Sequence, residues 1–240
     1  MNCDVGEGVG NEAQLFPLIS SCNIACGGHA GDASSMQRVV RLAKKFNVKV
    51  GAHPSYPDIK NFGRAAMDIP SEVLIQSIQE QIAALVCILG KENIRLHHIK
   101  AHGALYNTIA KNAELAELFL IAVAEYKKNT LIYVPYGSEI GRKAKEHDFS
   151  IAYEAFADRN YNTDLSLVSR SHPQALIESP EAVLKHIVRI VKHQKVRTLT
   201  DNTVKILAET FCIHSDTPSA FEIVSYLSKE LPNQSIRIKK

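Results

Sequence analysis

The chain has 240 residues, of which 45% are hydrophobic and 22% charged, a composition that indicates a globular protein with a sizeable core. A formal net charge of +3, with basic residues spread along the chain, argues against a nucleic-acid-binding protein. No stretch approaches the roughly eighteen unbroken apolar residues of a membrane span, and the start "MNCDVGEG" lacks the features of a signal peptide. The five cysteines form no CxxC pair, so we expect reduced thiols in a cytoplasmic protein.

The first unusual stretch in chain order is "NIACGGHAGD", residues 23–32, which contains three glycines. Glycine permits tight turns and the close approach of a ligand to the backbone. We therefore expect the chain to turn there from a strand into a helix, with His29 and Asp32 facing a bound ligand. Asp32 lies two residues before Ser34 and is also a candidate helix N-cap.

From there one rhythm recurs: a short apolar or β-branched run, then a polar cluster, then a helical stretch. The strand-and-cluster stretches are "VKVGAHPSY", "IRLHHIKAHGALYN", "LIYVPYGSE", "IAYEAFADRNY" and "FCIHSDTP". Apolar residues at spacings of three and four predict helices over 71–89, 113–127, 180–193 and 218–230. Ser179 before Pro180, and Thr217 before Pro218, are typical of helix starts.

Alternating strands and helices predict an α/β fold with a mostly parallel sheet. In every case the polar cluster follows its strand. An open sheet concentrates its ligand at one switch point, whereas a barrel gathers the carboxyl ends of all its strands around one mouth. The clusters therefore favour a barrel. Because no linker divides the chain, we expect a single domain over residues 1–240.

The strand ends collect side chains suited to acid–base chemistry, divalent-metal binding and anion binding. They are Asp4, Glu7, His29, Asp32, His53, Lys100, His102, Asp158, Arg159, His214 and Asp216. This set fits a hydrolase acting on a small polar molecule. Structural roles stay open for Asp216, at a helix N-terminus, and for Arg159, paired with Glu154 or Asp158. The role of His98, on the strand face of Lys100, also stays open.

Several other mechanisms lack their sequence signatures. The chain has no GxxxxGK[ST] loop, no dinucleotide-binding fingerprint and no GxSxG nucleophile elbow. Cys26 precedes Gly-Gly-His, but nothing around it indicates a lowered thiol pKa.

These clusters, in this order, resemble the LamB/YcsF family. The matching stretches are "NCDVGEG", "SSCNIACGGHAGD", "VGAHPSYPDIKNFGR", "IKAHGALYN", "EAFADRNY", "LVSRS" and "CIHSDTP". The resemblance implies a distorted (β/α) barrel, similar to the polysaccharide deacetylase and glycoside hydrolase type. It also implies hydrolysis of 5-oxo-L-proline to L-glutamate, with ATP as co-substrate and with partner B and C subunits.

The resemblance also implies the site. Catalytic roles fall to Asp4, Lys100, His102, Asp158 and His214. Substrate-binding roles fall to Glu7, His29, His53, Arg64, Arg159 and Asp216. We expect an Asp/His pair to act as general base, and Lys100 or Arg159 to bind the anionic group of the substrate. A divalent metal is a further candidate, with His29, Asp32 and His53 as its ligands.

Two alternatives remain. The His and Asp cluster also fits a stand-alone metal-dependent deacetylase or amidohydrolase. A non-catalytic barrel that binds a small carboxylate is the other alternative, because Gly28, Ala101 and Ser215 depart from the residues usual in the resembling family.

Overall fold

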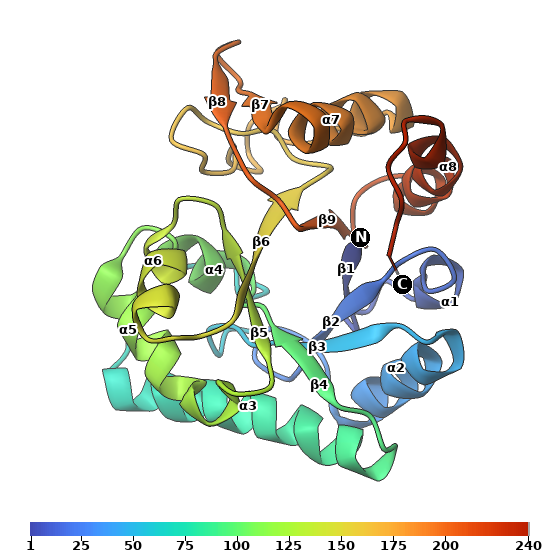
Figure 1. The fold of residues 1–240 in the computed structure, drawn as a ribbon. Helices are drawn as coiled ribbons and strands as arrows, with labels where there is room; N and C mark the ends of the chain where they lie inside the picture. Colours follow the sequence, from blue (N-terminus) through green and yellow to red (C-terminus); the bar gives the residue numbers. More distant parts are fainter. Residues whose placement is uncertain (240) are drawn as a thin grey trace.

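The computed structural model describes residues 1–239, in which seven parallel strands close into a barrel ringed by helices (Figure 1). The first strand closes the barrel by pairing with both the second and the last strand; its Asn2, for example, is in register with Ser21 and with Cys212. The strands, in their order around the barrel, are β1 (Asn2–Val5), β2 (Ser21–Ala25), β3 (Lys49–His53), β4 (Leu96–Ile99), β5 (Leu131–Pro135), β6 (Ile151–Phe156) and β9 (Thr210–His214). The predicted α/β barrel is confirmed.

Helices cover the outside of this barrel, and an antiparallel hairpin of β7 (Lys195–Arg197) and β8 (Thr203–Lys205) lies beside the seventh helix (Figure 1). The helices are α1 (Glu12–Leu15), α2 (Ala33–Phe46), α3 (Ser71–Lys91), α4 (Gly103–Ile109), α5 (Ala113–Ala122), the 3-10 turn η1 (Ala124–Tyr126), α6 (Glu139–Glu146), α7 (Pro180–His193) and α8 (Ala220–Asn233).

One predicted helix start is confirmed and the other is wrong. Ser179 accepts a hydrogen bond from the backbone N–H of Ala182, and Pro180 opens α7, as the sequence predicted. Thr217 does not cap α8, which begins at Ala220 after Ser219. The Thr217 hydroxyl instead donates to the Asp158 carboxylate in a charge-assisted hydrogen bond.

The two faces of the strands differ in chemistry, because successive residues of a strand point to opposite sides. Outward residues such as Cys3, Ile24 and Val50 are apolar and fully buried under the helices. Inward residues are polar and hydrogen-bond to one another across the barrel; they include Asn2, Asp4, Asn23, His98, Lys100, Glu154, Thr210 and Cys212. The interior is thus a polar network beneath the barrel mouth.

Helix α3 is long and apolar enough to cross a membrane when judged by length and composition alone. In the fold, however, its stripe of Leu74, Ile78, Ile82 and Leu85 is buried in the core. The barrel therefore accounts for the apolar face of this helix.

Candidate active site

A cavity of about 280 Å³ opens at the carboxyl ends of the barrel strands. Residues following β1, β3, β4, β6 and β9 converge on it because parallel strands end at the same side of a barrel. Its charged and imidazole side chains are Asp4, Glu7, His53, Arg64, Lys100, His102, Arg159, Arg170 and His214.

Lys100 forms the floor of the cavity and is buried among acids. Its Nζ lies 2.9 Å from Asp4 Oδ1 and 3.1 Å from Glu154 Oε1, and it donates to Cys212 Sγ at 3.0 Å. Burial lowers the pKa of Lys100, but the charge of Asp4, the neighbouring Cys212 and the charge of Glu154 together outweigh burial and raise it well above its ordinary value. Lys100 is therefore a permanent ammonium in this site.

Asp4 is the ionised partner of that ammonium. Burial raises the pKa of its carboxyl, but the electrostatic interaction with the neighbouring His53 and the charge of Lys100 outweigh burial and hold it well below its ordinary value. Asn23 also donates to Asp4 Oδ1 at 2.6 Å, and His98 Nε2 lies 2.5 Å from Asn23 Oδ1 in the layer below. The polar interior of the barrel thus fixes the carboxylate from beneath.

Asp158 and His214 form a buried carboxylate–imidazole pair at another side of the cavity. His214 Nδ1 lies 3.1 Å from both carboxylate oxygens of Asp158, and the His214 backbone N–H donates to Oδ2 at 3.0 Å. Burial raises the pKa of Asp158, but the electrostatic interaction with the neighbouring His214 and the hydrogen bonds from His214 and Thr217 lower it below its ordinary value. The pair leaves His214 Nε2 available to the cavity.

A third group brings together Glu7, His53 and His102. His53 Nε2 lies 3.0 Å from His102 Nδ1, and Glu7 Oε1 lies 3.4 Å from the same His102 nitrogen. His29 stacks on the His102 ring at 3.6 Å between centroids, and its Nε2 lies 3.0 Å from Glu7 Oε1. Burial, followed by the neighbouring His53 and His29, lowers the pKa of His102.

Three guanidinium groups line the cavity, and they differ in how they are held. Arg159 is buried and donates to the carbonyls of Val168 and Ala175, so it fastens the loop that follows β6. It makes neither of the pairings with Glu154 or Asp158 that stayed open from the sequence. Arg64 and Arg170 both contact Asp216 at the rim, at 2.5 and 3.5 Å.

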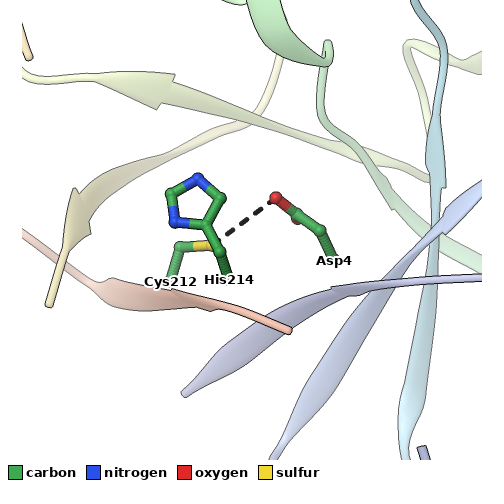
Figure 2. Close-up of side chains that lie close together, drawn as sticks. All are labelled: Asp4, Cys212 and His214. Atoms are coloured by element: carbon green, nitrogen blue, oxygen red, sulfur yellow. Dashed lines mark hydrogen bonds between the residues drawn. The ribbon is translucent and has the colours of Figure 1, made fainter. Parts of the chain in front are cut away.

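Figure 2 shows Asp4, Cys212 and His214, whose side chains face one another from β1 and β9. Cys212 Sγ lies 3.8 Å from Asp4 Oδ2. Burial and the charge of Asp4 raise the pKa of the Cys212 thiol well above its ordinary value. Cys212 is therefore a protonated thiol beside the Lys100 ammonium, not an activated nucleophile.

The structure brings together almost all of the residues predicted from the sequence. Eight of them line the cavity: Asp4, Glu7, His53, Arg64, Lys100, His102, Arg159 and His214. His29, Asp158 and Asp216 stand directly behind them, in contact with Glu7, His214 and Arg64.

Asp32 is the exception, and its predicted place in the pocket and among the metal ligands is wrong. Its exposed side chain accepts the backbone N–H of Ser35 at 2.7 Å and caps α2. Gly31, with φ of +87°, turns the chain away after His29. A Cβ there would collide with the Ala25 carbonyl, which explains the glycine.

Sequence reasoning missed Glu154, Cys212 and Arg170 as site residues. Glu154 and Cys212 are alternate residues on the inward faces of β6 and β9, so the strand period combined with Asp158 and His214 could have found them. Arg170 lies in "LVSRS", but its place at the cavity depends on a loop with no local signal.

Comparison with known proteins establishes the family of the chain. The LamB/YcsF family model matches residues 1–240. The chain belongs to the LamB/YcsF family. Family relatives from Pyrococcus abyssi and Thermococcus sibiricus, both named as the A subunit of 5-oxoprolinase, are 39% and 40% identical, each over 99% of this chain and 95% of the relative.

A solved structure of the "lactam utilization protein" from Thermus thermophilus superposes on this family member with a TM-score of 0.91. It is 34% identical, and the match covers 100% of this chain and 98% of that one. The barrel also aligns with a family 4 carbohydrate esterase from Streptomyces lividans at a TM-score of 0.48 and 10% identity, a match too weak to argue from.

Proposed function

We propose that this chain is the A subunit of an ATP-dependent 5-oxoprolinase, which hydrolyses 5-oxo-L-proline to L-glutamate together with B and C subunits. The names of its relatives, a 5-oxoprolinase component and a "lactam utilization protein", support a hydrolase acting on a cyclic amide. The observation that carries the proposal is the Asp158–His214 pair beside three cavity arginines. It supplies a base for water and cations for a carboxylate in one cavity.

The base is His214. Its Nδ1–H donates to Asp158, which holds the ring in the tautomer whose Nε2 carries a lone pair. Nε2 takes a proton from water as the water oxygen adds to the lactam carbonyl carbon. The ring C–N bond then breaks, and the nitrogen gains a proton and becomes the amine of glutamate. The carbonyl carbon is left as an acyl phosphate, whose hydrolysis gives the side-chain carboxylate.

ATP supplies the activation that this amide needs, because a lactam carbonyl is a poor electrophile. In our proposal the γ-phosphoryl group moves to the lactam oxygen, releasing ADP. Water then adds and opens the ring, and a second water hydrolyses the resulting acyl phosphate to glutamate and phosphate.

The substrate's carboxylate is held by the arginines and its reacting oxygen by Lys100. Arg64 and Arg170 project from loops at the rim and contact Asp216, and Arg159 is held by the carbonyl of Val168. A guanidinium fork matches a carboxylate in geometry and charge. Lys100 lies at the floor, where its ammonium would stabilise the negative charge of the phosphoryl group on the lactam oxygen.

The test is release of glutamate from 5-oxoproline by the full chain, with and without ATP and the B and C subunits. Release that needs ATP and partners is expected. Turnover of an amide or acetylated substrate without ATP would replace the proposal with a stand-alone deacetylase or amidohydrolase. Binding of 5-oxoproline without turnover, with all three subunits present, would indicate the carboxylate-binding barrel.

We also assign the complex to the cytoplasm. The five cysteines are all free thiols, four of them buried, as expected in a reducing compartment.

A further inference from the structure

The two imidazoles at the mouth face each other through nitrogens that carry lone pairs. His53 Nδ1 lies 2.8 Å from the Lys100 carbonyl oxygen, and His102 Nε2 lies 3.0 Å from the Phe62 carbonyl oxygen. A carbonyl oxygen only accepts, so each of these nitrogens carries the proton. In the neutral rings, His53 Nε2 and His102 Nδ1 are therefore both acceptors, and they lie 3.0 Å apart.

Carboxylate oxygens add to this convergence of acceptors. Glu7 Oε1 lies 3.4 Å from His102 Nδ1 and 3.9 Å from His53 Nε2, and Asp4 Oδ2 lies 3.5 Å from His53 Nε2. The side chains of Glu7, His53 and His102 are at most 7% exposed, so water screens these atoms only weakly. The Glu7 carboxylate and the two facing imidazole nitrogens are stable together only with a positive centre among them.

Residues behind the ligands hold them in place. His29 Nε2 lies 3.0 Å from Glu7 Oε1, and the His29 ring stacks on the His102 ring. The backbone carbonyls of Lys100 and Phe62 fix the tautomers of His53 and His102. Histidines that bind metals generally donate their other ring N–H in this way, which orients the ring and raises its basicity.

The neighbouring set of Asp4, Cys212 and His214 (Figure 2) differs from the Glu7 set, because it already contacts a side-chain cation. The Lys100 ammonium lies 2.9 Å from Asp4 Oδ1 and 3.0 Å from Cys212 Sγ. His214 Nδ1 is directed at Asp158 instead. The set around Glu7 contains no such side-chain cation within ion-pair distance among residues 1–239, apart from the imidazoles themselves.

We propose that Glu7 Oε1, His53 Nε2 and His102 Nδ1 bind one divalent transition-metal cation of the zinc class. Two imidazoles and one carboxylate suit zinc and its first-row neighbours, whereas magnesium and calcium prefer all-oxygen sites. Three protein ligands leave a position open, and all three of these residues line the active-site cavity. This ligand set differs from the one predicted from the sequence, because Glu7 and His102 take the places of His29 and Asp32 beside His53. The cation deepens the proposed function, in which it would polarise the lactam oxygen or its attacking water.

Metal binding by the full chain, without substrate or partner subunits, tests this site independently of the proposed function. After treatment with a chelator, the chain is titrated calorimetrically with Zn²⁺ and with Mg²⁺, and Co²⁺ is followed by its visible absorption. We expect one Zn²⁺ per chain, weak Mg²⁺ binding, and Co²⁺ bands without the intense near-ultraviolet transition of a Co–thiolate bond.

Variants assign the ligands. Glu7→Gln and His102→Gln should weaken Zn²⁺ binding by more than the roughly 10- to 100-fold loss typical when a group that orients a ligand is removed. Cys212→Ser, in the neighbouring set, is the matched control and should keep the affinity. Circular dichroism verifies that each variant is folded, and a rise in the wild-type melting temperature with Zn²⁺ provides a readout without mutation.

Three results would overturn the site. The first is the absence of stoichiometric Zn²⁺ binding and of any thermal shift, which would leave a proton shared between His53 and His102. The second is wild-type affinity in folded Glu7→Gln and His102→Gln. The third is loss of binding in Cys212→Ser, which would move the metal to the set of Figure 2. None of these results bears on ATP-dependent glutamate release.

Discussion

His214 Nδ1 is 3.1 Å from both carboxylate oxygens of Asp158, and the same carboxylate also accepts the His214 backbone N–H and the Thr217 hydroxyl. Three donors and two oxygens leave Asp158 no rotational freedom. The carboxylate holds the imidazole through Nδ1, so the direction of His214 Nε2 is fixed before substrate binds. Preorganisation of this kind makes the pair sensitive to small chemical changes.

Asp158→Asn should therefore reduce kcat by about 10³- to 10⁴-fold with little change in KM, as expected when a carboxylate that holds a catalytic imidazole becomes an amide. An asparagine has one accepting oxygen and would present N–H groups to His214 or Thr217. Steady-state glutamate release by the complete complex measures the effect. Glu146→Gln, on the exposed face of α6, is the matched control and should retain wild-type rates. More than a tenth of wild-type kcat in Asp158→Asn would remove His214 from the role of base.

Lys100 should prove essential to the fold as well as to the site. In Lys100→Met the carboxylates of Asp4 and Glu154 lose their buried counter-ion, and we expect the free energy of unfolding to fall by about 3–5 kcal/mol. Adding Glu154→Gln removes one of the unpaired charges, so the double variant should be more stable than the sum of the single effects predicts, by about 0.5–3 kcal/mol. Chemical denaturation of the four proteins completes the cycle. Strict additivity would contradict the ion pair.

Gly51 leaves room for His98 inside the barrel. A Cβ at Gly51 would overlap the His98 ring, which cannot move away because Asn23 holds its Nε2 and the ring stacks on Tyr133 at 3.9 Å. Gly51→Ala should therefore lower the free energy of unfolding by about 1–3 kcal/mol.

Gly90→Ala is the matched control for that substitution. Gly90 lies in α3, and a Cβ added to it would have no heavy atom within 4 Å, so alanine there should stabilise the protein by up to about 1 kcal/mol. Urea unfolding measures both changes in the free energy of unfolding. Equal changes for the two substitutions would show that the His98 ring can move to make room for a Cβ at Gly51.

Local patterns in the sequence predicted the barrel and most of the site. The polar clusters after successive strands placed Asp4, His53, Lys100 and His214 at one mouth, because parallel strands share their direction. The Ser179–Pro180 pair located the start of α7 to the residue, since capping is a local interaction.

What the sequence did not predict depends on contacts between distant segments. The tautomers of His53 and His102 are set by carbonyls 47 and 40 residues away along the chain, so no spacing rule distinguishes Glu7 from Asp32 as a metal ligand. Asp32 carries both a capping and a ligating chemistry, and only the turn at Gly31 decides between them. Glu154 was missed because only the closed barrel brings Lys100 to it.

The buried histidines predict how stability depends on pH. Burial lowers the pKa of His29, His98 and His102 in the folded chain, whereas an unfolded histidine titrates near pH 6.5. Below about pH 6.5 the unfolded state therefore binds more protons than the folded state, and stability is lost as the pH falls through that value. The lowered pKa values of Asp4 and Asp158 act in the same direction at lower pH.

His98 allows this dependence to be assigned to one residue. Each histidine kept neutral by the fold adds a slope of about 1.4 kcal/mol per pH unit to the free energy of unfolding below about pH 6. His98→Gln retains a donor for Asn23 and removes one titrating group, so its slope between pH 5 and 6 should be smaller than wild type by about that amount. Urea unfolding across this range, with a chelator present, measures the slope, and Gly90→Ala should keep the wild-type value. An unchanged slope in His98→Gln would mean that this imidazole is already protonated within the barrel, and the acceptor at Asn23 would then face a cation.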